Sequence, residues 1–154
     1  MKSVRKPYSK CEWTPSIPVI DYDEIVSATR IIIIEDEEMT RTTIESALTK
    51  KGLDVLLSTA SVSEALNFAK KHRPEAAVID YNLGKGPNGV DAANGLRKID
   101  PNIGIVLMTA FLNPTQLPTL LSKLPKGSHY LIKHSVTEIG VLVAEINEAI
   151  KYRA

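Results

Sequence analysis

The chain has 154 residues, of which 44% are hydrophobic and 24% are charged, a composition typical of a folded domain and not of a disordered segment. The formal net charge of +1 and the single cysteine, Cys11, argue against direct binding to nucleic acid through overall charge, and exclude an internal disulfide or a thiolate metal cluster. No apolar run reaches the roughly 18–20 residues of a membrane span. We therefore expect a soluble, cytoplasmic protein with no membrane contact.

The first 29 residues differ from the rest of the chain. They hold three prolines and the only tryptophan, and they show little hydrophobic periodicity. We interpret residues 1–29 as an N-terminal extension, made of an irregular arm and a short helix over 22–29. The pair Asp21 and Glu24 indicates the start of that helix. Residues 30–154 are predicted to form one further domain.

Strand-like and helix-like segments alternate from residue 30 onward. Strands are predicted at 31–34, 53–57, 76–79, 103–108 and 130–132, and helices at 38–51, 61–71, 90–99, 113–124 and 136–152. The β-branched run Ile31–Ile34 is typical of a strand that is buried on both faces. This alternation predicts an α/β fold, in which helices cover both faces of a five-stranded parallel sheet.

Two details of the helices follow from local sequence. Ser61 and Glu64 have the spacing of a capping box at the start of the second helix, and Gly52 should end the first. The segment 113–124 is broken by prolines. Because proline is tolerated only in the first turn of a helix, we expect a short, displaced or kinked helix that begins near Pro118.

Polar residues follow four of the predicted strands directly. Glu35 and Asp36 follow the first strand, Asp80 the third, Thr109 the fourth and Lys133 the fifth. Ligands of parallel sheets bind beyond the carboxyl ends of the strands, so these side chains should lie together. Clustered carboxylates raise their own pKa values or recruit a cation, and oxygen ligands suit Mg²⁺. An ammonium and a hydroxyl beside such an ion indicate a site for a phosphoryl group.

The acidic run after the first strand is predicted to divide. Carboxylates in the first turn of a helix interact favourably with the helix dipole. We therefore expect Glu37 and Glu38 to begin the next helix, which leaves Glu35 and Asp36 for the metal.

Four segments of the sequence resemble a known family. The segments "RIIIIEDEE", "AAVIDYNL", "IGIVLMTA" and "HYLIK" are similar, in order and spacing, to the signature strands of bacterial response regulator receiver domains. The resemblance covers roughly residues 30–152. It implies a doubly wound, flavodoxin-like sheet with the strand order 2-1-3-4-5.

The resemblance also implies roles for individual residues. Asp80 would accept the phosphoryl group, and Glu35, Asp36, Asp80 and the backbone carbonyl of Asn82 would hold Mg²⁺ or Mn²⁺. Thr109 would contact the phosphoryl group, and Lys133 would pair with it.

Signalling in the family depends on a conformational switch. Tyr130 would be the aromatic residue that follows Thr109 when the domain is phosphorylated. The fourth helix, fifth strand and fifth helix would then form the face that binds a downstream protein or a second copy. A sensor histidine kinase or a phosphotransfer protein would supply the phosphoryl group.

The sequence departs from the family pattern at two positions of the site. Glu35 stands where aspartate is the common choice, and we expect function to survive because contact with the metal can pass through water. His134 follows Lys133 where the family commonly has proline. A non-proline cis peptide costs about 2.5–4 kcal/mol, so we expect a trans bond there.

We carry three hypotheses for function. The first is a receiver of a two-component phosphorelay that catalyses only its own phosphorylation and dephosphorylation, with no output domain after it. Such a receiver would bind a partner, pass the phosphoryl group on, or be the excised receiver of a longer protein. The second is an interaction module with the same fold that is never phosphorylated. The third is a Mg²⁺-dependent phosphatase that uses Asp36 as nucleophile, although Glu38 stands where that class has a second aspartate.

Overall fold

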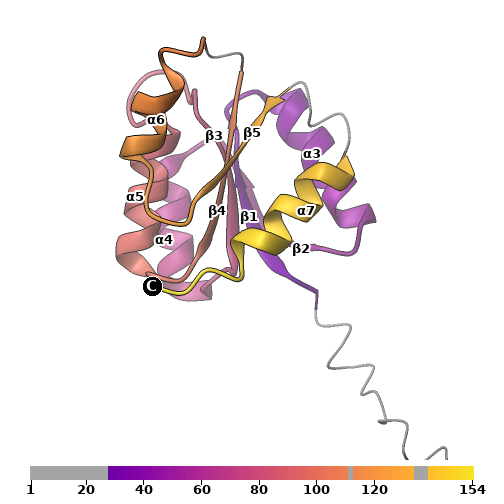
Figure 1. The fold of residues 1–154 in the computed structure, drawn as a ribbon. Coiled ribbons are helices and arrows are strands. Elements are labelled where there is room, and N and C mark those ends of the chain that lie inside the picture. The colour runs from indigo at the N-terminus through magenta and orange to yellow at the C-terminus, as the bar shows by residue number, and fades with distance from the viewer. Residues whose placement is uncertain (1–27, 111–112, 134–138) are drawn as a thin grey trace, which may run out of the picture.

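The protein is a five-stranded parallel sheet covered by helices on both faces (Figure 1). The computed structural model describes residues 28–110, 113–133 and 139–154. The strands are β1 (Arg30–Ile34), β2 (Asp54–Thr59), β3 (Ala76–Asp80), β4 (Gly104–Thr109) and β5 (His129–Ile132). They pair in the order β2-β1-β3-β4-β5, which confirms the predicted fold.

The helices divide between the two faces of the sheet. In the described residues they are α3 (Glu38–Lys50), α4 (Val62–His72), α5 (Gly89–Ile99), α6 (Leu117–Lys123) and α7 (Ile139–Ala149). One apolar cluster joins the sheet to α3 and α7, and a second cluster joins the opposite face to α4, α5 and α6. Figure 1 shows the two helical layers on either side of the twisted sheet.

The four isoleucines of β1 explain why this strand lies inside the sheet. All four are fully buried. Ile31 and Ile33 point into the cluster with α3 and α7, and Ile32 and Ile34 point into the other. Alternate residues of a strand face opposite sides, so a continuous apolar run suits a strand covered twice. Burying each such side chain stabilises the fold by about 1.5–3 kcal/mol.

Helix α6 is short, as the prolines predict. It has seven residues, and Pro118 lies in its first turn. Backbone N–H groups in the first turn have no acceptor within the helix, so the absence of an N–H in proline costs no hydrogen bond there. Asn113 does not cap it directly. Its Oδ1 accepts from the backbone N–H groups of Thr115 (3.1 Å) and Gln116 (3.0 Å) in the turn before the helix.

Three predicted details are corrected. Strand β2 extends to Thr59, beyond the predicted Leu57, because Thr59 pairs with Ile34 of β1. The capping box at α4 is only half formed: the Ser61 hydroxyl accepts from Glu64 N (3.2 Å), but the Glu64 carboxylate accepts from the Thr59 hydroxyl. Helix α7 ends at Ala149, before Tyr152.

Three predictions fall outside the described residues. These are the short helix over 22–29, the start of the last helix near residue 136, and the peptide bond between Lys133 and His134. The boundary between the extension and the domain also stays a prediction, although β1 does begin at Arg30.

Gly89, the first residue of α5, lies directly against the strand that ends in Asp80. A Cβ at Gly89 would lie 2.4 Å from the Asp80 carbonyl oxygen and 2.8 Å from Leu107 Cδ1, so the backbone would have to move. We expect Gly89→Ala to lower the free energy of unfolding by about 2 kcal/mol, a typical cost of overpacking. Urea denaturation measures this change.

Gly140 in α7 provides the matched control for that substitution. A Cβ there would meet nothing within 4 Å, and alanine is the better helix former. Gly140→Ala should therefore leave the unfolding midpoint unchanged or raise it. Equal losses of stability in the two variants would contradict the proposed close contact at Gly89.

Candidate functional site

Glu35 lies where β1 reaches the carboxyl edge of the sheet. Its side chain is fully buried, and its backbone N–H donates to the Thr59 carbonyl of β2 at 3.0 Å. Its Oε1 accepts from the Glu37 N–H at 3.1 Å, and Arg41 Nη1 donates to its carbonyl oxygen at 2.9 Å. Both the carboxylate and the backbone of Glu35 are thus held in place.

The second half of the acidic run begins α3, as predicted. Asp36 is exposed beside Glu35. Glu37 caps α3, since its carboxylate accepts from the N–H groups of Met39 (3.1 Å) and Thr40 (2.6 Å). Hydrogen bonds from Thr40 lower the pKa of Glu37. Glu38 lies in the first turn of the helix, so the second half of the run stabilises a helix end.

Asp80 and Lys133 join two further strands to this corner. Asp80 ends β3 and is almost fully buried, and Lys133 follows β5 directly. The Lys133 ammonium lies 2.9 Å from Glu35 Oε2 and 3.1 Å from Asp80 Oδ2. One cation thus bridges two buried carboxylates that come from different strands.

The pKa values reflect this arrangement. Burial raises the pKa of Glu35 to about 7, although Lys133 opposes the shift. Burial alone would lower the pKa of Lys133, but its pairing with Glu35 and Asp80 outweighs that effect and raises the pKa. The ammonium therefore keeps its charge at neutral pH and balances part of the negative charge of the site.

Glu35, Asp36 and Asp80 can together hold a metal ion. Each offers a carboxylate oxygen, and these atoms lie within 4.8 Å of one another. Glu35 Oε2 is buried and faces the Lys133 ammonium without a well-directed hydrogen bond. Oxygen donors with no histidine or cysteine among them suit a hard cation such as Mg²⁺. The chemistry of these three carboxylates therefore fits such an ion.

Three other residues with predicted roles lie near this edge. Thr109 ends β4, is buried, and donates from its hydroxyl to the Ala110 carbonyl at 3.1 Å. Asn82 follows Asp80 by two residues, and its N–H lies 3.4 Å from Asp80 Oδ1. Tyr130 lies in the edge strand β5 and is 37% exposed.

Residues 31–138, more than half of the chain, match the response regulator receiver domain. The chain belongs to this family.

Individual relatives agree with the assignment. Chemotaxis protein CheY of Thermotoga maritima is 30% identical over 81 residues, which cover 53% of this chain and 67% of that protein. Transcriptional regulatory protein PdtaR of Mycobacterium tuberculosis is 30% identical over 96 residues, which cover 61% of this chain but only 44% of that protein. The crystal structure of a receiver protein from Sinorhizobium medicae superposes with a TM-score of 0.70 at 25% identity, and the match covers 84% of this chain and 99% of that one.

Two residues of this receiver domain support the site but were not predicted from the sequence. Arg41 reaches back from α3 to the Glu35 carbonyl. Gly84 approaches Asp36 so closely that a Cβ would lie 3.4 Å from Asp36 Oδ2, and its φ of +77° favours glycine. The sequence did contain a signal for Gly84, because it belongs to the glycine-rich loop that follows Asp80. Its contact with Asp36, however, depends on the fold.

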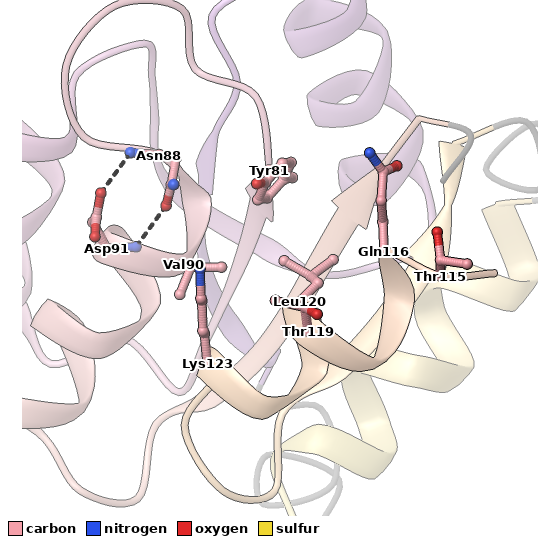
Figure 2. A pocket seen from close by; sticks show the side chains of 9 residues that line it. All are labelled: Tyr81, Asn88, Val90, Asp91, Thr115, Gln116, Thr119, Leu120 and Lys123. Atoms are coloured by element: carbon pink, nitrogen blue, oxygen red, sulfur yellow. Dashed lines mark hydrogen bonds between the residues drawn. The ribbon is translucent and has the colours of Figure 1, made fainter. Parts of the chain in front are cut away.

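A separate groove of about 450 Å³ opens between the start of α5 and α6 (Figure 2). Tyr81, the neighbour of Asp80, contributes to its lining together with Leu120 of α6. The Asn88–Asp91 capping box forms one wall, with both of its hydrogen bonds at 3.0 Å. None of the three carboxylates near Lys133 lines this groove, so it is distinct from the acidic site.

None of the described helices is both long and apolar enough to cross a bilayer.

Proposed function

We propose that this receiver domain accepts a phosphoryl group on Asp80. The observation that carries the proposal is the position of the Asp80 carboxylate. It lies 3.1 Å from the Lys133 ammonium and within the same 4.8 Å cluster as the carboxylates of Glu35 and Asp36. A carboxylate so placed can attack a phosphorus atom and form an acyl phosphate.

An Asp80 carboxylate oxygen forms a bond to phosphorus, and the bond from phosphorus to the donor's leaving atom breaks. In phosphoryl transfer most of the catalysis is positioning and charge stabilisation. The buried position of Asp80 fixes its oxygen, and Lys133 offers its ammonium to the oxygens of the incoming group. The Thr109 hydroxyl, one strand away, is proposed to donate a hydrogen bond to the same group.

A divalent ion completes the proposed site. Glu35, Asp36, Asp80 and the carbonyl oxygen of Asn82 would hold Mg²⁺ or Mn²⁺. When bound, the ion neutralises negative charge on the transferring group. Glu35 is longer than the aspartate common in the family, but its carboxylate is positioned by Glu37 N–H and by Lys133, which supports the same role.

Partners follow from the family and from the exposed residues. We propose that a sensor histidine kinase or a phosphotransfer protein in the cytoplasm donates the phosphoryl group. The output face would comprise α6, β5 and α7, where Leu121 and Tyr130 are exposed large apolar residues. Tyr130 would change its side-chain position with Thr109 and thus report phosphorylation to a protein partner or to a second copy of the chain.

Mass spectrometry of the intact protein tests the proposed function. After incubation with Mg²⁺ and a small phosphodonor such as acetyl phosphate, we expect one added phosphoryl group, and peptide mapping should place it on Asp80. Removal of Mg²⁺ with EDTA should prevent the modification. A chain that stays unmodified while another receiver is labelled would support an interaction module that is never phosphorylated.

Asp36→Asn is expected to weaken Mg²⁺ binding by at least about tenfold, because it removes one of three charged ligands. Asp36 is exposed, so this substitution leaves no buried polar group without a partner. Titration of metal-dependent phosphorylation measures the effect. Glu38→Gln is the matched control, since Glu38 lies in α3. Loss of turnover of a phosphate ester in Asp36→Asn but not in Asp80→Asn would instead indicate a phosphatase.

A further inference from the structure

A second charged hollow lies at the opposite edge of the sheet from Asp80. It has a volume of about 410 Å³ and lies where β1, β3 and β4 begin. Three arginines from distant parts of the chain line it: Arg30 in β1, Arg73 after α4, and Arg153 after α7. We call this hollow the arginine groove.

Among the side chains that line it, the arginine groove has more positive than negative charge. Its three guanidinium groups meet two carboxylates, those of Glu75 and Asp100. Glu75 is engaged with Arg30, whose Nε lies 3.7 Å from Glu75 Oε2, and Asp100 accepts from the Asn102 N–H at 3.0 Å. Within the ranges that the structure describes, no carboxylate pairs with Arg73 or Arg153.

The hydrogen bonds of Arg153 also leave its charge uncompensated. Its Nη1 donates to the carbonyl oxygens of Ile150 (2.8 Å) and Tyr152 (2.7 Å). These carbonyl acceptors are neutral, so they hold the guanidinium at the groove without neutralising its positive charge. A guanidinium with N–H groups still available is well suited to bind a carboxylate with two parallel hydrogen bonds.

The backbone of Arg73 is a second, independent observation. Arg73 ends α4 in the left-handed conformation, with φ 47° and ψ 65°, and it is the one non-glycine residue with positive φ in the described ranges. Glycine is the favoured residue there, because a Cβ destabilises this conformation. The chain keeps a long cationic side chain where glycine would be more stable, and such strain points to a use for the side chain.

An anionic segment of the same chain precedes the strand that begins at this edge of the sheet. Residues 21–24 read "DYDE" and supply three carboxylates, whereas residues 1–20 contain only one acidic residue. The chain enters β1 beside the groove, where the Thr29 carbonyl accepts from the Asp54 N–H at 2.9 Å. Glu24 is six residues before Arg30, and six extended residues span about 20 Å. A segment tethered so closely has a high effective concentration at the groove.

We infer that the acidic segment 21–24 of the N-terminal extension binds in the arginine groove, with its carboxylates paired to Arg73 and Arg153. This contact gives the extension a defined place on the domain, beside the residues that follow α7. It lies at the other edge of the sheet from Asp80, so neither the contact nor its test depends on phosphorylation.

Zero-length crosslinking of the full chain tests the contact directly. In the Arg73→Lys and Arg153→Lys variants the charge remains, and a carbodiimide can join the new amine to a nearby carboxylate. We expect crosslinks from both positions to Asp21, Asp23 or Glu24, and 0.5 M NaCl should reduce them because salt screens exposed charges. Lys98, exposed on α5, is the control amine. Crosslinks to residues 21–24 that are as frequent from Lys98 as from the two variants would overturn the inference.

Mixing isotope-labelled with unlabelled chains identifies the source of the acidic segment. Crosslinks within one chain support the inference, and crosslinks mainly between labelled and unlabelled chains overturn it in favour of a second copy.

Hydrogen exchange provides a second measurement that does not need a reactive side chain. In the double variant Arg73→Glu, Arg153→Glu, the amides of residues 21–24 should exchange about fivefold faster than in the unmodified chain, as the loss of two surface ion pairs predicts. Reversing the charge of the segment with Asp21→Lys and Asp23→Lys should restore slow exchange. Lys70→Glu with Lys98→Glu, both outside the groove, should change nothing. Unprotected amides in the unmodified chain would overturn the inference.

Arg73→Gly separates docking from folding. Because glycine is favoured at positive φ, the urea midpoint should rise or stay the same, while the exchange of residues 21–24 becomes faster. Slow exchange that persists in this variant would show that Arg73 does not hold the segment.

Discussion

Asp80→Asn is expected to abolish phosphorylation of the chain and leave its fold intact. Asparagine has nearly the same shape as aspartate, but it lacks the anionic oxygen that would attack phosphorus in the proposed reaction. Thr109, Lys133 and the other carboxylates would remain in place. Intact-mass measurement after incubation with Mg²⁺ and acetyl phosphate should therefore show no added phosphoryl group. Circular dichroism and urea denaturation would show that the variant is folded.

The stability of the Asp80→Asn variant is informative as well. The substitution removes one of three neighbouring carboxylates, and Lys133 can still pair with Glu35 at 2.9 Å. The unfolding midpoint should be unchanged or higher, since like charges in a site repel. Asp54→Asn, an exposed change at the start of β2, is the control and should be labelled normally. Labelling of Asp80→Asn at the unmodified rate would contradict the assignment of the phosphoacceptor.

The sheet could be predicted from sequence because each strand carries its own signal. The isoleucines of β1 can only be accommodated in a strand covered on both faces, and the polar residues after the strands meet because parallel strands share their carboxyl edge. The short helix α6 was predicted from Pro118 for the same local reason. These features depend on residues that are close to one another in the sequence, so one sequence is enough to predict them.

Features that depend on register could not be predicted in this way. Thr59 belongs to β2 because it pairs with Ile34. Its hydroxyl donates a hydrogen bond to the Glu64 carboxylate, which the sequence had assigned to a capping box. The contact of Arg41 with the Glu35 carbonyl likewise depends on how α3 leaves the sheet. The sequence predicted Lys133 as a partner of a phosphoryl group, but its bridge between Glu35 and Asp80 depends on the relative positions of three strand ends.

That bridge leads to the second large effect. We expect Lys133→Met to destabilise the metal-free protein by about 2 kcal/mol. Removing one partner of a buried ion pair costs about 3–5 kcal/mol, and the cost is lower here because Lys133 is 29% exposed and a carboxylate can take up a proton. Methionine keeps most of the length and apolar contacts of the lysine stem, so the loss of stability reflects mainly the loss of the positive charge.

Mg²⁺ should partly replace the missing ammonium in that variant. A ligand that binds only the folded state stabilises it by an amount that grows with its concentration relative to Kd, about 2.7 kcal/mol at one hundred times Kd. Two carboxylates without their ammonium offer the ion a more negative site. Mg²⁺ should therefore raise the unfolding midpoint of Lys133→Met by more than it raises that of the unmodified chain, as urea denaturation with EDTA or with Mg²⁺ would measure.

Matched variants show whether the effect arises from charge. Glu35→Gln in the Lys133→Met background should recover most of the lost stability, because it removes one of the two carboxylates that the lysine bridges. Lys98→Met, at an exposed position of α5, should change the midpoint little. If Lys133→Met were as stable as the unmodified chain without metal, the ammonium would not be needed to hold these carboxylates in the folded state. Its role would then begin only when a phosphoryl group arrives.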